Sequence, residues 1–393
     1  MKKIALYFTV FLVLSSLSIV EHSEPASQEV IKIGHIRPLT GNLAATSDLM
    51  VKSFDLAFQQ INYQVAGKQI QIVIGDSQGN PQASTDVAKK MVENDKVAMI
   101  VGPTTVAENA AIANYLNQVG IPHITTSQIP YNIITADKWG VGVGGTSEQL
   151  CSSMGVYAYD HLKYRKLDIL TQDTGSGKAY LGAFINAFKN KGGQIVQEQY
   201  TAFPAPDFAP YLTTLRDADA LAVWTNGADA IKFLTQYHEM GIGKKLPLLG
   251  AYHGAFLSPF TLKALPPAAA EATIGKLVPT PYSPFLDNAV NKKFVPLIQS
   301  KMNLVPDDTE SALYQTGMAI IEALKATGGD TTPVKLRQAL LSLDFEGPQG
   351  RMRFDPQTAV AIKTTYICKV MKRGNDYLWE SVFTYNDVPA KGF

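Results

Sequence analysis

Short apolar runs alternate with segments of helical periodicity along most of the chain. Residues 31–36 form an apolar run that stops before Pro38, and Val51, Phe54 and Phe58 then recur at steps of three and four. The run is typical of a strand, and the recurring positions are typical of a helix with one apolar face.

The alternation continues through two consecutive series. Further strands are expected at 70–74, 97–101, 121–125, 167–170, near Ile195, 220–224 and 246–249, with helices between them. A long helix is expected from Asp308 to the Gly328-Gly329 pair, and Thr332-Pro333 should start the next one. This order predicts an α/β fold with two doubly wound parallel-sheet lobes. No low-complexity linker separates the series, so several short crossings should join the lobes.

The first residues form a unit of their own. Lys2 and Lys3 precede an apolar run at 4–20, and polar residues follow. This is the pattern of a secretory signal over residues 1–26. A retained anchor is the alternative, but the run is shorter than the ~20 residues of a membrane span. No Cys follows the run, so the sequence predicts an exported, periplasmic protein without lipid attachment there.

Composition excludes some functions. The 393 residues carry 35 Lys and Arg against 34 Asp and Glu, a net charge of +1. There is no basic surplus for phosphates, so no nucleic-acid partner is expected. Two cysteines cannot build a disulfide-rich scaffold or a Cys-only zinc site. No metal and no cofactor are expected.

Three motifs resemble parts of enzymes. Residues 140–145 (GVGVGG) match a dinucleotide fingerprint but follow no apolar strand, and 173–175 (DTG) has no second copy. Residues 175–178 (GSGK) lack the first glycine and the hydroxyl of a phosphate loop. All three favour Gly-rich turns between elements. With no convergent base, nucleophile or metal set, the chain is not expected to be an enzyme.

Small polar residues follow the predicted strands at their carboxyl ends. In open parallel sheets ligands bind at this edge, and hydroxyls and backbone N–H groups there suit a carboxylate. Each residue alone also fits an ordinary cap or turn. The candidates are Thr46, Thr104, Thr105, Ser127, Gln128, Ser176, Gly177, Asn226, Tyr252 and His253. Arg37 is either a further carboxylate partner or a solvated turn residue.

Four segments carry a resemblance to a known family: 36–41 (IRPLTG), 100–103 (IVGP), 120–122 (GIP) and 353–355 (RFD). In this order and spacing the chain resembles the type I periplasmic solute-binding proteins of ABC transporters, of the leucine/isoleucine/valine-binding family. The resemblance covers about 28–390. It implies a non-enzymatic receptor with two lobes and three crossings, near 148, 276 and 366. Lobe 1 would then comprise 28–147 and 277–366, and lobe 2 would comprise 148–276 and 367–393.

The resemblance also implies a site. The family's carboxylate clamp falls on Thr104, Thr105, Val106 and Ser127, with Val106 where the family usually has Ser. The family's second-lobe positions fall on Ser176 or Gly177, on Asn226 and near Tyr252. The acid that pairs with an amino acid's ammonium is missing from residues 250–254. Because a buried ammonium needs a countercharge, a carboxylate without an ammonium is favoured over leucine. Asp229 is a substitute acid, but a solvent-facing position on its helix is favoured.

The expected function is a monomeric receptor that closes on a small carboxylate, or on a branched-chain amino acid-like solute, and delivers it to an ABC permease. The alternative is a sensory or regulatory binding module with the same fold. Cys151 and Cys368 lie just past the first and third crossings. Two separate buried thiols are favoured, and a disulfide in an oxidising compartment is the alternative.

Overall fold

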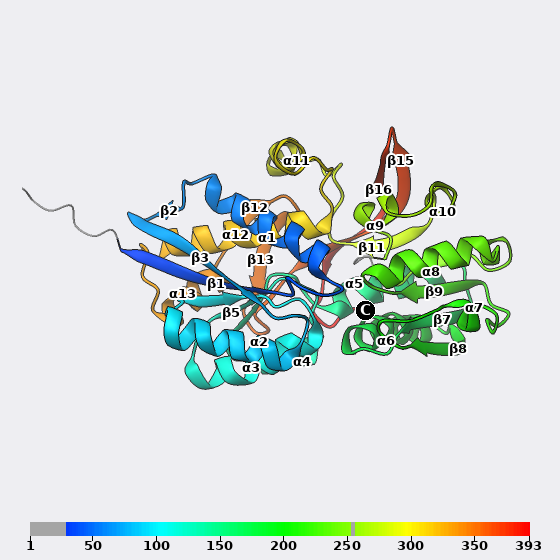
Figure 1. The fold of residues 1–393 in the computed structure, drawn as a ribbon, viewed down its shortest axis with the longest axis horizontal. Coiled ribbons are helices and arrows are strands. Elements are labelled where there is room, and N and C mark those ends of the chain that lie inside the picture. The colour runs from blue at the N-terminus through cyan, green and yellow to red at the C-terminus, as the bar shows by residue number, and fades with distance from the viewer. Residues whose placement is uncertain (1–28, 253–255) are drawn as a thin grey trace, which may run out of the picture.

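The computed structural model describes residues 29–252 and 256–393, so the predicted export signal at 1–26 lies outside the described residues. The described chain forms two α/β lobes that lie side by side in Figure 1. Each lobe has a sheet with parallel central strands and antiparallel strands at the edge. The predicted fold class is therefore confirmed.

The first sheet has the order β12-β13-β14-β6-β5-β4-β1-β3-β2, with β3, β1, β4, β5, β6 and β14 parallel. Its strands are β1 (Val30–Arg37), β2 (Gln64–Val65), β3 (Lys68–Asp76), β4 (Met99–Val101), β5 (His123–Thr125), β6 (Gly140–Gly142), β12 (Asp344–Gly347), β13 (Gly350–Asp355) and β14 (Val360–Ala361).

The second sheet has the order β16-β15-β11-β10-β9-β7-β8, with β8 to β11 parallel to β7. Its strands are β7 (Lys166–Gln172), β8 (Gln194–Thr201), β9 (Ala220–Trp224), β10 (Leu248–Gly250), β11 (Leu277–Thr280), β15 (Lys363–Arg373) and β16 (Asp376–Val388).

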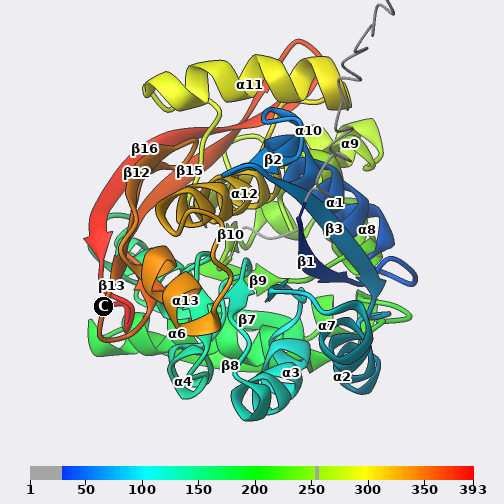
Figure 2. The same ribbon diagram turned by 90° about the vertical axis from the view of Figure 1, so that its left-hand side faces the viewer.

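Helices cover both faces of the sheets, as Figure 2 shows for the first lobe. The first-lobe helices are α1 (Ala44–Gln59), α2 (Pro81–Lys90), the π-helix η1 (Met91–Asp95), α3 (Val106–Val119), α4 (Tyr131–Ala136), α11 (Ala289–Met302), α12 (Asp308–Ala326) and α13 (Pro333–Leu341). The second-lobe helices are α5 (Ser147–Asp160), α6 (Gly175–Asn190), α7 (Ala209–Leu212), α8 (Ala228–Glu239), the 3-10 helix η2 (Ile242–Lys244), α9 (Pro259–Lys263) and α10 (Pro267–Glu271).

Each lobe has its own apolar core. In the first lobe the predicted apolar face of α1 packs against β1 and α12, and the rings of Phe54 and Phe58 lie 5.1 Å apart. The core of the second lobe joins α5, α6 and α8 to the central strands and includes Phe184 and Phe233. Each sheet therefore packs in its own lobe, and the cleft between the lobes lies where the strand ends of the two sheets meet.

The sheet pairing differs from the predicted division at two crossings. Leu277 on β11 pairs with Leu249 on β10, and β15 starts at Lys363, so residues 277–280 and 363–366 lie in the second sheet and not in the first lobe. The chain thus returns to the first lobe after Thr280 and leaves it again after Ala361. A short apolar strand fits either sheet by its pattern, and only its pairing partners decide which one it joins.

The glycine motifs also take a different form. Gly140–Gly142 is the buried central strand β6, not a turn. Glycine at 140 leaves space for Asp137, whose Cγ would lie 2.9 Å from an added Cβ. Residues 173–178 run from a bend into the first turn of α6, where the Thr174 hydroxyl accepts a hydrogen bond from the Gly177 N–H. Thr332 precedes α13 but makes no capping hydrogen bond with its side chain.

Cys151 on α5 and Cys368 on β15 are both buried free thiols, so the alternative of a disulfide is not realised in this structure. Within residues 29–252 and 256–393, no helix is both long and apolar enough to span a bilayer. No cluster of His, Cys, Asp and Glu in these residues is suited to a metal ion.

Candidate functional site

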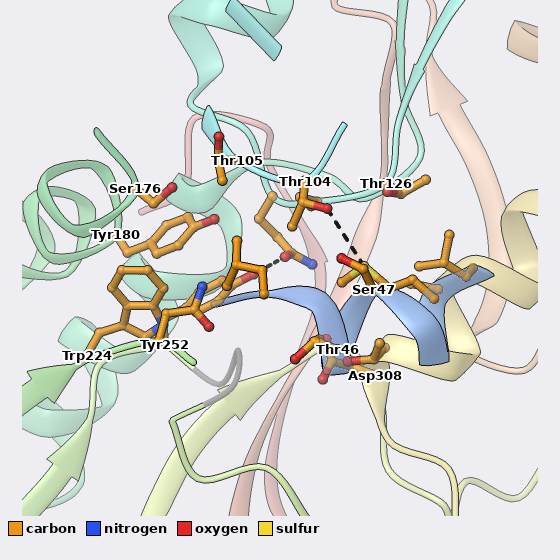
Figure 3. Close-up of a pocket in the computed structure, with 18 residues that line it drawn as sticks. Thr46, Ser47, Thr104, Thr105, Thr126, Ser176, Tyr180, Trp224, Tyr252 and Asp308 are labelled. Carbon is orange, nitrogen blue, oxygen red and sulfur yellow. Dashed lines mark hydrogen bonds between the residues drawn. The ribbon is translucent and has the colours of Figure 1, made fainter. Parts of the chain in front are cut away.

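A cavity of about 90 Å³ lies in the cleft between the lobes (Figure 3). A buried water needs about 10–15 Å³, so this space admits a small organic molecule. Eight predicted residues line it: Thr46, Thr104, Thr105, Ser127, Gln128, Ser176, Asn226 and Tyr252. The cavity therefore lies at the carboxyl ends of the parallel strands, the edge where open parallel sheets bind ligands (the strand-end rule).

The first-lobe loops meet at the cavity because their strands are parallel neighbours. Thr104 and Thr105 follow β4, and Ser127 and Gln128 follow β5. Thr105 also caps α3. Its hydroxyl accepts a hydrogen bond from the Glu108 N–H, and the Glu108 carboxylate accepts one from the Thr105 N–H. The capping box fixes the direction in which this loop leaves the sheet.

Gly102 allows the loop after β4 to pass close to β1. Its φ of +87° is unfavourable for other residues, and an added Cβ would lie 2.4 Å from the Ile36 carbonyl oxygen. The loop therefore brings Thr104 down beside Arg37 and the cavity.

Arg37 is not solvated and does not line the cavity. It is fully buried behind it, and its guanidinium donates to the hydroxyls of Thr104 at 3.2 Å and Thr126 at 2.6 Å. Its Nε donates to Nε2 of His35 at 2.8 Å. Burial lowers the pKa of Arg37 to about 9, which still leaves the side chain charged at neutral pH.

Two further predicted residues lie beside the cavity but do not line it. Val106 is buried, and its backbone N–H donates across the cleft to the Ser176 hydroxyl at 3.5 Å. Gly177 is buried in α6, where an added Cβ would lie 2.2 Å from the Gln172 carbonyl oxygen. Gly177 is therefore a close-packing glycine. His253 lies outside the described residues.

Three aromatic side chains form the second-lobe wall. Tyr180 and Tyr252 stack with their centroids 4.0 Å apart and 7° between the planes, and Trp224 meets Tyr180 edge-on at 4.9 Å. All three residues are buried, and all three line the cavity. Burial raises the pKa of both phenols, so both stay neutral. The wall offers a flat apolar surface with hydroxyls at its edge.

Tyr252 also spans the cleft. Its hydroxyl donates to Oε1 of Gln128, which belongs to the first lobe. Together with the contact between Val106 and Ser176, this hydrogen bond joins the lobes at the cavity. In this structure the lobes are therefore in contact across the site.

An acid lies at the cavity, contrary to the expectation from residues 250–254. Asp308 lines the cavity from the first turn of α12. Its neighbour Asp307 caps the same helix and accepts from the Thr309 N–H at 2.7 Å. Burial and the adjacent Asp308 raise the pKa of Asp307 to about 6, and burial also raises that of Glu310. The acid comes from a distant helix, so the missing acid in the loop does not exclude a solute with a hydrogen-bond donor.

Asp229 is not the substitute acid. It is buried rather than solvent-facing, and its Oδ2 accepts from the Gln172 amide at 2.9 Å and from the Ala205 N–H at 2.8 Å. It does not line the cavity. These contacts join the start of α8 to the end of β7 and to the loop after β8, so Asp229 supports the second-lobe side of the cleft.

The lining residues that the sequence analysis missed have different signals. Trp224 ends the predicted strand 220–224, and the strand-end rule applies to it directly. Thr126 and Ser47 also belong to the small polar residues that follow predicted strands, and they stand next to the predicted residues Ser127 and Thr46. Tyr180 and Asp308 lie inside helical segments, where nothing local distinguishes them from core or surface positions. The remaining missed residues are Leu43, Met50, Thr309, Ala312 and Leu313.

The sequence profile of the family described as periplasmic binding protein matches residues 30–375. Leu/Ile/Val-binding protein homolog 6 of Brucella melitensis biotype 1 is 24% identical over 381 residues, which cover 95% of this chain and 94% of the relative. The solute-binding protein of an ABC transporter from Rhodopseudomonas palustris BisB5, solved with 3,4-dihydroxybenzoic acid, is 26% identical with a TM-score of 0.85, covering 92% of this chain and 98% of that one. A leucine-binding protein from Thermotoga maritima is 22% identical with a TM-score of 0.80, covering 91% and 99%.

Proposed function

Because the chain belongs to the periplasmic binding protein family of ABC transporters, we propose that its solute is a small carboxylate with an aromatic body. Members of this family are solute-binding receptors that work with an ABC permease, and the chain has this role. One observation carries the choice of solute. A single cavity combines first-lobe hydroxyls with the stacked rings of the second lobe.

The two kinds of surface suit the two ends of an aromatic acid. Hydroxyls such as those of Thr104 and Thr126 donate to a carboxylate, and each charge-assisted hydrogen bond contributes about 1.5–3 kcal/mol. Tyr180 and Trp224 offer contact to a flat ring. The neighbour from R. palustris BisB5 holds such a molecule, 3,4-dihydroxybenzoic acid. A branched-chain amino acid lacks the ring, so it is the weaker candidate for this wall.

The solute is released to the permease when the lobes part. Gln128 and Tyr252 are joined across the cleft, as are Val106 and Ser176, and a bound molecule between the lobes would add contacts to both. A solute that contacts both lobes stabilises the closed form by its differential affinity. We also propose that residues 1–26 direct export to the periplasm, that the receptor is a monomer and that it binds no nucleic acid.

Calorimetric titration of the purified protein with 3,4-dihydroxybenzoate, benzoate and leucine tests the proposal. We expect 3,4-dihydroxybenzoate to bind more tightly than leucine. At 100-fold excess over the dissociation constant it should raise the free energy of unfolding by about 2.7 kcal/mol. Small-angle scattering should show a smaller radius of gyration with the bound acid. Tight leucine binding without binding of any aromatic acid would show that the solute class is wrong.

A further inference from the structure

Arg37 is a buried cation directly behind the cavity. It ends β1 with no exposed surface, and among the described residues no carboxylate oxygen lies within 4.0 Å of its guanidinium. The acid whose charge acts on it is Glu108, whose carboxylate is engaged by the Ser84 hydroxyl and the Thr105 N–H. A buried charge without a close countercharge is costly, so its retention here calls for a role.

The contacts of Arg37 fix the direction of two hydroxyl groups. A guanidinium donates hydrogen bonds and accepts none, so Oγ1 of Thr104 and Oγ1 of Thr126 must be acceptors toward it. His35 accepts from Nε of Arg37 and so holds the fork in place. Each threonine is left with its own O–H to donate elsewhere.

Both threonines line the cavity, and their O–H groups have little else to donate to. The Thr104 hydroxyl lies 3.9 Å from Sδ of Met50, a weak acceptor. Among the described residues, none accepts a hydrogen bond from the Thr126 hydroxyl. Figure 3 shows the two side chains together above α1, with Asp308 beside Thr46 on the lower side of the view. The cavity therefore has one part that presents donors over a buried positive charge and another that presents an acid.

We infer that Arg37 is a positioning residue that makes the Thr104–Thr126 part of the cavity selective for a carboxylate over the corresponding neutral amide. This inference rests on the proposed carboxylate receptor and names the residues that set its selectivity. Arg37 acts through the threonines: it holds their oxygens, directs their O–H groups at the solute and supplies a positive charge behind them. An amide gains less from that charge and brings its own N–H groups toward groups that already donate.

The test compares an acid with its amide. The wild type and the variants Arg37→Gln, Arg37→Lys and Thr126→Val are titrated with 3,4-dihydroxybenzoate and 3,4-dihydroxybenzamide. We expect the wild type to prefer the acid. In Arg37→Gln the acid should weaken at least tenfold and the amide less than threefold, so the preference collapses. Thr126→Val should lower the preference in the same direction, and Arg37→Lys should keep part of it.

Arg337 provides a matched control, since it is a partly buried arginine of the same lobe that donates to the Gly140 carbonyl oxygen and does not line the cavity. Arg337→Gln should leave the acid-to-amide preference unchanged. A purely structural role for Arg37 predicts equal losses for acid and amide, and that result would overturn the inference. If Arg37→Gln does not fold, an unchanged preference in both Thr126→Val and Arg37→Lys overturns it as well. If the wild type binds no carboxylate, the proposed function and this inference both fail. The wild-type titration alone shows this, whereas failure of the inference alone appears only in the variants.

Discussion

The two lobes present different chemistry to the same cavity. The first lobe contributes hydroxyls from the first turn of α1 and from the loops after β4 and β5, and Arg37 holds two of them, those of Thr104 and Thr126, from behind. The second contributes rings from three different kinds of position: Tyr180 within α6, Trp224 at the end of β9 and Tyr252 after β10. The first surface comes from residues that follow strands, whereas the second joins two residues at strand ends, Trp224 and Tyr252, to a helix residue, Tyr180, by packing between elements.

This difference assigns separate tasks to the lobes. On the proposed function, the hydroxyls fixed by a cation would recognise the charge of the solute, and the stacked rings would recognise its shape. Asp308 is the exception, because it brings an acid from α12 of the first lobe to the same cavity. The substitutions below test each part of this division, from the largest expected effect to the smallest.

Removing the centre of the aromatic wall should have the largest effect. Tyr180→Ala deletes the ring that contacts both Tyr252 and Trp224. We expect binding of 3,4-dihydroxybenzoate to weaken by about 100-fold, because a buried aromatic contact of about 2–3 kcal/mol is lost. Titration calorimetry measures this. Phe184→Ala is the control, since Phe184 is buried on the same helix outside the cavity, and it should lower stability but change affinity less than about threefold. Similar affinities for both variants would contradict the role of the wall.

Neutralising the acid should separate solutes with a donor from those without one. In Asp308→Asn we expect 4-hydroxybenzoate to bind about tenfold more weakly, because a charge-assisted hydrogen bond is replaced by a neutral one. Benzoate has no such donor and should bind equally well or more tightly. The exposed Asp48, paired with Lys52 on α1, offers Asp48→Asn as a control without effect. If the affinities for 4-hydroxybenzoate and benzoate change by the same factor, Asp308 does not bind the hydroxyl end of the solute.

The first-lobe acid cluster should make stability depend on pH. The pKa of Asp307 is raised to about 6 by burial, so its protonated form is favoured in the folded state. The stability that this raised pKa adds to the folded state is fully present below the usual pKa of Asp near 3.8, and it is lost as pH rises through about 6. Asp307→Asn keeps the capping oxygen without the charge. We expect it to be about 1–3 kcal/mol more stable than the wild type at pH 7.5 and about equal at pH 4, as measured by urea unfolding.

Asp330→Asn is the control for this pH effect. Asp330 is only partly buried, and the hydrogen bond from Lys335 lowers its pKa. Removing its charge should therefore lower the free energy of unfolding at pH 7.5, the opposite of the effect of Asp307→Asn. A lower stability of Asp307→Asn at pH 7.5 would show that the Asp307 carboxylate is better stabilised than its burial indicates.

The hydrogen bond across the cleft should have the smallest effect. Tyr252→Phe removes the hydroxyl that donates to Gln128 but keeps the stack with Tyr180. A neutral hydrogen bond contributes about 0.5–1.5 kcal/mol, so affinity for 3,4-dihydroxybenzoate should fall about threefold to tenfold. Tyr237→Phe removes a hydroxyl that donates to the Leu246 carbonyl within the second lobe, and it should leave affinity unchanged. If Tyr252→Phe and the wild type bind 3,4-dihydroxybenzoate with equal affinity, this hydrogen bond does not contribute to closure on the solute.

Eight of the sixteen strands in the described residues, and the main helices, were predictable from the sequence. The apolar runs correspond to β1, β3, β4, β5, β7, β8, β9 and β10, and the helical periodicity to α1 and α12. Residues 140–142 were not predicted as a strand, because a Gly-Val-Gly segment has little strand propensity. It is a strand because β5 and β14 pair with it on either side. The short strands β2, β11, β12, β13 and β14 and the hairpin of β15 and β16 were likewise not predicted.

The candidate site divides in the same way. Thr104, Thr105, Ser127 and Gln128 were predicted because parallel strands place the residues that follow them at one edge, a rule that depends only on position in the chain. Arg37 directly ends β1, but its polarity predicted exposure or direct solute contact, and the fold buries it instead. Burial of a charge depends on which loop passes over it, and here that loop contains Gly102 and comes from β4.

The sequence by itself thus determined the α/β class, two lobes and the hydroxyl-rich edge, because periodicity and strand ends are local properties of the chain. Only the tertiary structure decided which sheet β11 joins, how Tyr180 stacks on Tyr252, and that Asp308 reaches the cavity from a helix more than 50 residues away in sequence from the Tyr252 loop. The physical reason is that these features depend on contacts between elements distant in the chain, whose partners are fixed by packing and not by any local pattern.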